Sequence, residues 1–440
     1  MTDFPKKLKP LLYYEDNQIA FIGSLDDNFF IKVSPIMKDF LKVCERLNTE
    51  ELNHYLINRY PENIVRLFYK KLDTYKRYLF KETKEKNVDP FNFKRTITTV
   101  TLNLSHACNL KCTYCFEGLE FRHNSRMMRS DIALKAVERF IDQLGSEKGT
   151  IIFTGGEPLV NFPVIKDVVN FVKTKEKNIE FFIKTNATLM TDEVMDFLIS
   201  NGFLIQISID GCREAHDFHR RTVDGRATFD TVERAIQSLL SRGYGHHVIL
   251  NGTVTHQTIE LLEESYEYFK CFKGIRSFFI KPVMGSNDQN FVLSDEDYRI
   301  YERSLFSLAR ERFFSEERNN MAYDKLEGIC GIGVWHIAVD VDGKIYPCYR
   351  LSGMDDFAMG DIFQSALSHL IIPDALVNLY NIDLDNKCSE CFGKVFCRKG
   401  CYADKLLSSP SNLCACVERR FGEYFIIENL KNTHMMLPLI

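Results

Sequence analysis

The sequence lacks any apolar run that approaches the ~18 residues needed to cross a bilayer. Its first 18 residues carry positive charge but have neither the apolar stretch nor the small-residue cleavage site of a secretory signal. We therefore expect no membrane span and a cytoplasmic location.

An excess of basic charge is also missing, since the formal net charge is −4 and the pI is about 6.3. Nucleic acids select basic surfaces, so nucleic acid is not an expected partner. Low-complexity segments are absent, and the apolar share of 45% is ordinary for a soluble globular protein. At 440 residues the chain exceeds the usual size of one hydrophobic core, which predicts two or three domains.

Cysteine, in contrast, is abundant and clustered. A long chain without an export signal is a poor candidate for a disulfide scaffold, so its fourteen cysteines favour metal binding. Three lie at positions 108, 112 and 115, and eight lie between 330 and 416. We interpret the others, Cys44, Cys212 and Cys271, as core or loop residues without a functional role.

The sequence pattern divides the chain into three segments. Residues 1–95 have short strands and then three helices that begin near Ser34, Asn48 and Pro61, which predicts a winged-helix-like module. The polar stretch 81–94 around Pro90 is typical of a linker. Residues 326–440 are rich in cysteine and open with a β-hairpin whose turn is Asp342-Gly343.

Between residues 96 and 325, β-rich and helical stretches alternate, which predicts an α/β fold built on a parallel sheet. We expect an open (β/α)6 barrel with reactive groups at the carboxyl ends of its strands. The expected strands are 99–104, 150–155, 179–185, 203–209, 247–254 and 277–283. The expected helices are 128–144, 163–175, 191–201, 227–242, 258–269 and 294–316.

The first cysteine group follows the first strand of this barrel, with three and two residues between its members Cys108, Cys112 and Cys115. Three thiolates on one loop can hold three irons of a four-iron cluster and leave the fourth iron open to a ligand. A structural zinc site needs four protein ligands, and beyond this triplet the loop offers only His106. Zinc is therefore the less favoured alternative.

This CxxxCxxC loop, with Tyr114 before its last cysteine, resembles the signature of radical S-adenosylmethionine enzymes. The resemblance implies that the open iron chelates the amino and carboxylate groups of S-adenosylmethionine. One electron from the cluster then cleaves the cofactor to methionine and a 5′-deoxyadenosyl radical, which abstracts hydrogen from unactivated C–H bonds. It also implies a reducing partner such as flavodoxin or ferredoxin.

The second strand ends in the sequence FTGGEPL. Gly155 and Gly156 let the backbone approach a ligand closely, and Glu157 can accept a hydrogen bond from an ammonium group. Two glycines alone are typical of any strand-to-helix turn. After the cysteine triplet, the run that ends at Pro158 resembles the family's GGEP motif, which binds the methionyl amino group.

The third and fourth strands end in further polar residues. Their positions match those where the family places contacts to the ribose and carboxylate of the cofactor, and they are Asn186, Ser208, Asp210 and Arg220. An Asp-Gly pair after a strand is often only a turn. We interpret His216 and Asp217 as structural, and no residue is assigned as the general base.

The C-terminal cysteine spacing resembles the SPASM domain, which carries auxiliary [4Fe–4S] clusters. Two fully ligated clusters need about eight thiolates, and residues 330–416 contain eight, which predicts three clusters in the whole chain. By analogy, the inner cluster takes Cys330, Cys348 and Cys401, and the outer takes Cys388, Cys391, Cys397 and either Cys414 or Cys416. The remaining cysteine completes the inner cluster; zinc-ribbon-like sites are the alternative.

Radical enzymes with a SPASM domain act largely on peptides and proteins. The N-terminal module resembles a precursor-recognition element, in which a leader peptide adds a strand to a sheet edge, although a small stabilising cap is equally compatible. The resemblance implies that the enzyme installs a crosslink in a ribosomally made peptide. The bond is either carbon–carbon, such as Lys to Trp in streptide-type maturases, or a thioether.

Two alternatives stay open. Anaerobic sulfatase maturases share the barrel and SPASM domain and oxidise Cys or Ser to formylglycine. They place an acidic base after the second hairpin cysteine, where Tyr349 follows Cys348 here, and they lack the long N-terminal module. A non-enzymatic iron–sulfur electron carrier is the other alternative, but it leaves the GGEP motif, Asn186 and Ser208 without a purpose.

Overall fold

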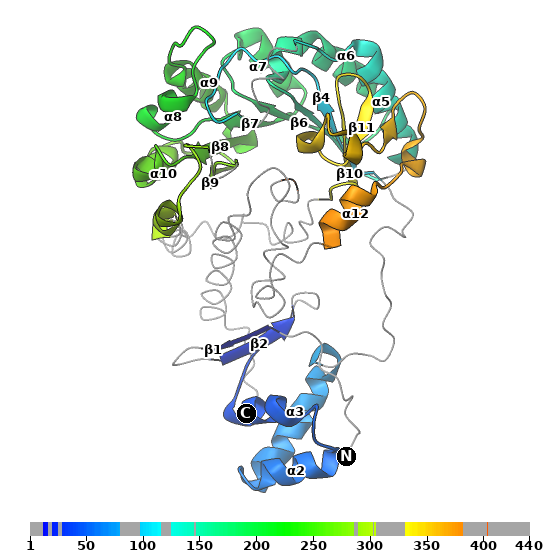
Figure 1. Ribbon diagram of the computed structural model, residues 1–440, viewed down its shortest axis with the longest axis vertical. Coiled ribbons are helices and arrows are strands. Elements are labelled where there is room, and N and C mark those ends of the chain that lie inside the picture. Colours follow the sequence, from blue (N-terminus) through cyan, green and yellow to red (C-terminus); the bar gives the residue numbers. More distant parts are fainter. Residues whose placement is uncertain are drawn as a thin grey trace. The chain divides into compact units, whose positions relative to one another are not determined.

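The computed structural model describes residues 12–15, 20–24, 29–79, 97–115, 125–144, 147–285, 289–301, 303–304, 331–381 and 403 (Figure 1). These residues fall into two compact units, one within 1–88 and the other within 89–382 together with Ala403. Within these ranges no helix combines the length and the apolar character needed to cross a bilayer.

The described residues of the N-terminal unit form three strands followed by three helices. The strands form an antiparallel sheet in chain order and are β1 (Leu12–Glu15), β2 (Ala20–Ser24) and β3 (Phe29–Lys32). The helices are α1 (Pro35–Val43), α2 (Thr49–Ile57) and α3 (Glu62–Leu79). The predicted order of strands followed by helices is confirmed. The first β-rich stretch of the sequence forms two strands, β1 and β2.

The helices of this unit begin where their capping residues predict. The Ser34 hydroxyl accepts a hydrogen bond from the amide of Met37 at 3.3 Å, which caps α1. Asn48 and Glu51 form a reciprocal capping box at the start of α2, with bonds of 3.0 Å. The helices enclose a core of their own, which includes Cys44, as predicted.

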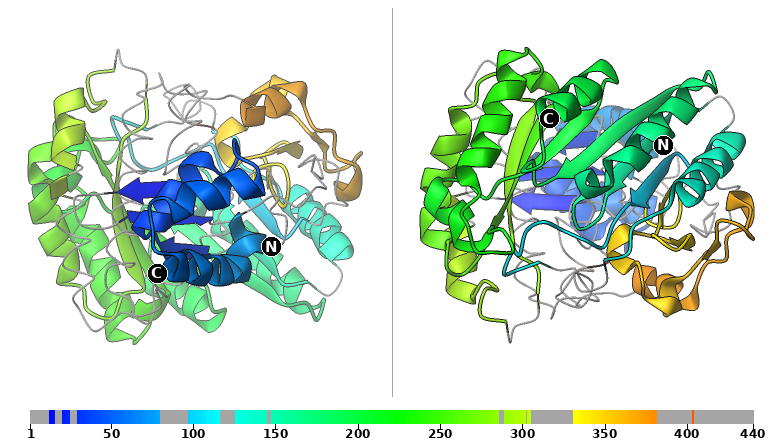
Figure 2. Two further views of the ribbon diagram at one scale, coloured as in Figure 1. Left: turned by 90° about the horizontal axis from the view of Figure 1, so that it is seen from below. Right: turned by 90° about the horizontal axis from the view of Figure 1, so that it is seen from above.

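In the described part of the second unit, nine strands form one sheet in the order β12-β11-β10-β4-β5-β6-β7-β8-β9. Its strands β4 to β9 run parallel to one another in chain order (Figures 1 and 2). They are β4 (Thr99–Asn103), β5 (Gly149–Thr154), β6 (Ile179–Thr185), β7 (Leu204–Ser208), β8 (Val248–Val254) and β9 (Ser277–Pro282). The prediction of six parallel strands is confirmed.

Helices connect successive strands of this sheet and cover one of its faces (Figure 2). They are α5 (Ser130–Leu144), α6 (Phe162–Lys173), α7 (Asp192–Ser200), α9 (Phe229–Ser241) and α10 (Leu262–Lys270). Residues 295–301 are helical, as predicted, and the later part of that expected helix lies outside the described residues. The helix α8 (Arg213–His219), which stands between β7 and α9, was not predicted.

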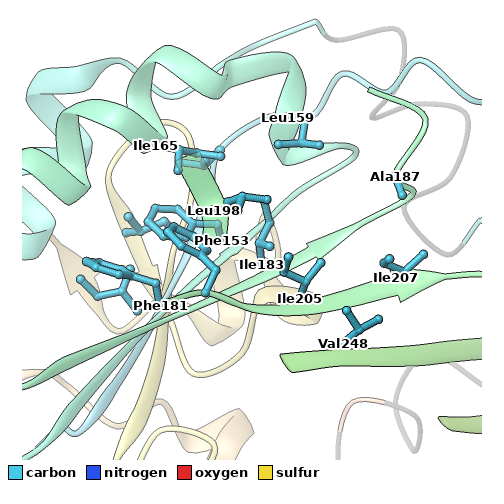
Figure 3. Packing of buried hydrophobic residues seen from close by; sticks show 14 of the residues in the cluster. Phe153, Leu159, Ile165, Phe181, Ile183, Ala187, Leu198, Ile205, Ile207 and Val248 are labelled. Carbon is cyan, nitrogen blue, oxygen red and sulfur yellow. The ribbon is translucent and has the colours of Figure 1, made fainter. Parts of the chain in front are cut away.

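The core lies between the sheet and these helices. Alternate strand residues are buried against the helices, and Figure 3 shows Phe153, Phe181 and Ile205 among them, with Ile165 of α6 above. The rings of Phe181 and Phe203 stack with their centroids 5.1 Å apart. Because the strands are parallel, their carboxyl ends meet at one edge of the sheet, where the candidate site residues lie.

The predicted C-terminal hairpin is confirmed as β10 (His336–Val339) paired antiparallel with β11 (Lys344–Tyr346). It does not form a sheet of its own, because β10 pairs in parallel with β4. The side-chain amide of Asn103 donates to Asp340 at 2.8 Å across this junction. The hairpin therefore extends the barrel sheet beyond β4.

Short elements complete the described C-terminal part. They are β12 (Gly360–Asp361), α12 (Asp374–Asn381) and the 3-10 turns η6 (Tyr349–Leu351), η7 (Asp355–Phe357) and η8 (Leu367–His369). A small core gathers around Tyr346 and Leu351 and includes the buried Cys348. The expected boundary near residue 326 stays a prediction.

Candidate cofactor site

The cysteine loop, residues 105–115, directly follows β4. All three of its thiols are half-buried, and the amide of Cys115 donates to the carbonyl of Cys112 at 3.2 Å. Burial raises the pKa of the Cys108 thiol to about 12. Three thiols gathered on one short loop are the donor type that a soft metal centre prefers, so this loop suits a bound metal centre.

Gly155 and Gly156, at the end of β5, hold the backbone of the cysteine loop. The amide of Gly156 donates to the carbonyl of Ser105 at 2.7 Å. A Cβ atom on Gly156 would lie 2.5 Å from the carbonyl oxygen of Ala107, and one on Gly155 would lie 2.4 Å from that of Ser105. Gly155 also has a φ of +140°, which glycine adopts readily. The space that a side chain would fill here is therefore taken by the cysteine loop.

The Glu157 carboxylate joins the ends of β5 and β6. It is buried and accepts hydrogen bonds from the amide of Leu159 at 3.1 Å, the hydroxyl of Thr185 at 2.7 Å and the amide of Asn186 at 2.7 Å. Burial nevertheless raises its pKa to about 7. Pro158 follows as the first residue of the 3-10 turn η1 (Pro158–Asn161), which Glu157 caps.

We expect Glu157→Gln to lower the stability of the chain by about 1–3 kcal/mol, because the amide keeps one acceptor oxygen for three donors and leaves a buried donor unpaired. The effect is measured as a lower midpoint of thermal unfolding. Glu193→Gln is the matched control. Because the Glu193 side chain is exposed, this substitution should change the stability by no more than about 0.5 kcal/mol. Equal midpoints for the two variants would contradict the expectation.

The raised pKa of Glu157 also predicts that the stability of the folded chain depends on pH. Because the folded-state pKa of Glu157 lies above its ordinary value of 4.5, the folded chain keeps this proton in a window where the unfolded chain has released it. Stability therefore falls as the pH rises from about 4.5 to about 7. The Glu157→Gln variant lacks this contribution, so the difference between the two midpoints shrinks over that window.

Asn186 lies between Glu157 and the cysteine loop. Its side-chain amide donates to Asn109 at 3.0 Å and approaches the sulfur of Cys108 at 3.8 Å. Ser208, at the end of the neighbouring strand β7, is half-buried. The structure therefore places Asn186 beside the first cysteine and Ser208 on the same edge of the sheet.

Asp210 and Arg220 form a buried ion pair beneath the cysteine loop, with 2.9 Å between the Arg220 Nε and an Asp210 oxygen. The hydroxyl of Tyr114 donates to the same carboxylate oxygen, and the Arg220 guanidinium lies 5.5 Å from the centre of the Tyr114 ring. The other Asp210 oxygen accepts from the amide of Thr253 at 2.9 Å. Burial raises the pKa of Asp210, and the Arg220 charge opposes that rise.

These contacts bear on the cofactor roles that the sequence resemblance implies. Tyr114 stands between Cys112 and Cys115, so Asp210 and Arg220 hold the loop through it. Both residues thus have a structural task that the sequence motif does not reveal. Their contact with the cofactor stays a prediction.

His219 is a site residue that the sequence analysis missed. Its Nδ1 bonds the hydroxyl of Thr113 in the cysteine loop, and its Nε2 lies 2.7 Å from the hydroxyl of Thr255 after β8. Burial lowers its pKa to about 4, so the ring is neutral. The only sequence signal was its place in the run HDFHR after β7, near Arg220.

His216 and Asp217, in contrast, have the structural roles expected of them. The Nε2 of His216 lies 3.0 Å from the hydroxyl of Thr228. The Asp217 carboxylate accepts from the amides of Thr228 and Phe229 at 2.9 and 3.0 Å, at the start of α9. Both residues fix the turn between α8 and α9.

The donor set of the loop suits an iron–sulfur cluster better than zinc. The remaining candidate ligand, His106, is buried with its Nε2 2.8 Å from Asp340. Three thiols without a fourth ligand from this loop match a cluster with one open iron.

Of the second cysteine group, only Cys348 lies among the described residues. Cys348 is buried at the start of η6. Seven of the predicted ligands lie outside the described residues, and these are Cys330, Cys388, Cys391, Cys397, Cys401, Cys414 and Cys416. Their assignment to two clusters stays a prediction.

Comparison with known families agrees with both cysteine groups. The family model of the radical SAM superfamily matches residues 102–269, which include the cysteine loop and Gly155–Pro158. The model of the SPASM iron–sulfur cluster-binding domain matches residues 330–392.

Individual relatives agree with these matches. The chain is 28% identical, over 68% of its length and 86% of the relative, to the cysteine-type anaerobic sulfatase-maturating enzyme of Clostridium perfringens. The solved structure of native anSMEcpe with bound AdoMet aligns with 76% of this chain and 100% of its own, at a TM-score of 0.65 and 24% identity. Streptococcus suis SuiB bound to precursor peptide SuiA aligns with 93% of this chain and 99% of its own, at a TM-score of 0.55 and 14% identity.

Proposed function

The chain is a radical SAM enzyme that carries a SPASM domain, and from this premise we propose that it installs an intramolecular crosslink in a ribosomally made precursor peptide. It binds S-adenosylmethionine and iron–sulfur clusters. The bond is carbon–carbon, such as Lys to Trp, or a thioether. In this proposal residues 1–95 bind the leader, 96–325 form the barrel and 326–440 form the SPASM domain.

The roles of the site residues follow from their contacts. Cys108, Cys112 and Cys115 hold the first cluster, and the cofactor lies across the strand ends at Gly155–Pro158, Asn186, Ser208, Asp210 and Arg220. When bound, the cluster and S-adenosylmethionine supply a radical that abstracts hydrogen from the peptide. Asn186 orients the first cysteine, and Tyr114 holds the loop down on Asp210.

Among the described residues, the face of the sheet that is turned away from the helices carries half-buried polar side chains beside this site, and we propose that the substrate binds there. Residues of β6 to β8 that face away from the helices are only half-buried, and they include Lys184, Gln206, Ser208 and Asn251. The ammonium of Lys184 lies 4.6 Å from the ring centre of Tyr349, which follows Cys348. Tyr349, which belongs to the SPASM segment, thus reaches this face. In this proposal two further clusters held by the eight cysteines of that segment accept the electron left after bond formation.

The N-terminal sheet is the observation that carries the peptide proposal. Among its described strands, β1 and β3 each pair on one side only, so their outer edges can accept an added peptide strand. The unit lies outside the radical SAM match at 102–269. The likeness in fold to SuiB, which was solved with its precursor peptide, covers 93% of this chain, whereas that to anSMEcpe covers 76%.

The test is anaerobic incubation of the reduced enzyme with the short peptide encoded beside its gene. We expect a product lighter by about two hydrogen atoms, with release of 5′-deoxyadenosine and methionine. The peptide without its leader is the control. It should react with a lower kcat/KM, because the strand that binds the N-terminal sheet is missing.

An unchanged peptide mass, with cofactor cleavage confirmed in the same sample, would refute the crosslinking proposal. Equal kcat/KM values for the full and leaderless peptides would instead favour a stabilising cap as the role of the N-terminal unit. Mass spectrometry and chromatography of the nucleoside separate these outcomes.

Formylglycine formation is the second candidate, favoured by the 28% identity to a sulfatase-maturating enzyme. Tyr349 follows Cys348 where those enzymes would place an acidic base, and it contacts Lys184. Incubation with a sulfatase peptide that contains the Cys or Ser target, followed by capture of an aldehyde with a hydrazide, tests this reaction.

A further inference from the structure

The turn that follows α8 lies directly against the cysteine loop. The amide of Lys111 donates to the carbonyl of Arg221 at 2.7 Å, and the amide of Thr113 to that of His219 at 3.4 Å. Leu110 also forms an antiparallel bridge with Thr222. Three backbone contacts therefore connect this turn to the segment that carries the cysteines.

The outward side of this junction is exposed. We call it the turn patch and define it as the exposed residues Lys111, Thr113, Phe218, Arg221, Val223, Asp224, Gly225 and Arg226. Phe218 is 52% exposed and Val223 is 68% exposed, so two apolar side chains face solvent here. Exposed apolar side chains on the same turn as exposed polar and charged ones are typical of a protein-binding surface.

The patch is positively charged, although the whole chain is negative. Lys111, Arg221 and Arg226 contribute three cations against the one carboxylate of Asp224, while the formal net charge of the chain is −4. Arg226 pairs with Asp224 at 2.8 Å, and the Arg221 guanidinium donates to the carbonyl of Gly225 at 3.1 Å. The arginines therefore belong to an ordered turn, and the surplus charge faces solvent.

We infer that the turn patch docks a small acidic electron-carrier protein that reduces the cluster on the cysteine loop. The inference rests on the proposal that Cys108, Cys112 and Cys115 hold that cluster. The carrier loses one electron and the cluster gains it, and no bond forms or breaks at the interface. Charge complementarity selects an acidic carrier over a neutral or basic one.

The position of the patch explains why it suits this task. A carrier seated on Arg221 and Val223 touches the turn that is bonded to Lys111, the residue before Cys112. Its cofactor thus approaches the cluster without entering the face of the sheet where substrate would lie. Opposite charges raise the rate of encounter, and they do so most strongly at low ionic strength.

The test compares two electron donors on the full-length enzyme. Arg221→Glu/Val223→Glu changes two exposed side chains of the patch and no residue of the cysteine loop. With a purified acidic flavodoxin in its hydroquinone form, we expect roughly tenfold slower cofactor cleavage at low salt and weaker flavodoxin binding by calorimetry. With dithionite, cleavage without any peptide should keep its rate.

Lys273→Glu/Ile371→Glu is the matched control, because it changes the net charge equally at one exposed cation and one exposed apolar residue. Lys273 precedes β9, at the edge of the sheet opposite the cysteine loop. The control should bind flavodoxin as the unaltered enzyme does. Equal flavodoxin binding by both variants, or a dithionite-driven rate that falls with the flavodoxin-driven one, would overturn the inference.

Discussion

Gly156→Ala is expected to slow the cleavage of S-adenosylmethionine by at least about a hundredfold. The added methyl group would lie 2.5 Å from the carbonyl oxygen of Ala107 and 2.8 Å from its carbonyl carbon, so the cysteine loop must shift. A displacement of about 1 Å at a reacting group costs on the order of a hundredfold in rate. Release of 5′-deoxyadenosine with dithionite as reductant measures the effect.

Gly202→Ala is the control that distinguishes the effect of this collision from the backbone strain caused by replacing a glycine. Gly202 has a φ of +67°, and nothing lies within 4 Å of a Cβ added there, so that variant has backbone strain without a collision. It should keep its rate of cleavage and lose about 1–2 kcal/mol of stability. The expectation would be wrong if Gly156→Ala kept both its rate of S-adenosylmethionine cleavage and its iron and sulfide content. The collision with Ala107 would then not displace the cysteine loop.

Asp210→Ala is expected to destabilise the chain by about 3–5 kcal/mol, because it leaves the buried guanidinium of Arg220 without its carboxylate partner. It also removes the acceptor of the Tyr114 hydroxyl, which lies between Cys112 and Cys115. The midpoint of thermal unfolding should fall by on the order of ten degrees. Iron and sulfide content after anaerobic reconstitution should fall with it.

Asp230→Ala is the matched control for that loss. Asp230 pairs with Arg213 at 2.6 Å, but both side chains are exposed, and such pairs contribute little to stability because solvent screens them. Similar midpoints for Asp210→Ala and Asp230→Ala would show that the buried pair does not stabilise the loop.

The regular part of the fold could be predicted from the sequence because it rests on local patterns. β-rich runs such as residues 179–185 and the caps Ser34 and Asn48 are readable without knowledge of distant residues. The pairing of β10 with β4 could not be predicted in this way, since it joins His336 to Thr99 across more than half of the chain. Helix α8 was missed because it has only seven residues.

The candidate site shows the same division. The spacing of Cys108, Cys112 and Cys115 and the two glycines after β5 are local motifs, so they could be recognised from the sequence. The bond of His219 to Thr113 depends on how the turn after α8 folds back onto the loop, which no local pattern encodes. Two partners of Glu157, Thr185 and Asn186, lie at the end of β6, far along the chain, and could likewise not be predicted from a local pattern.

The pairing of β10 with β4 also affects the order of events during synthesis. Strand β4 emerges early, but the strand that covers one of its edges is translated more than 230 residues later. Until then the nascent chain presents an unpaired strand edge next to the cysteine loop, and such edges invite aggregation. We expect the cysteine loop to reach its final geometry only after residues 336–339 have left the ribosome, so release before that point would yield a chain that associates through β4 instead of maturing.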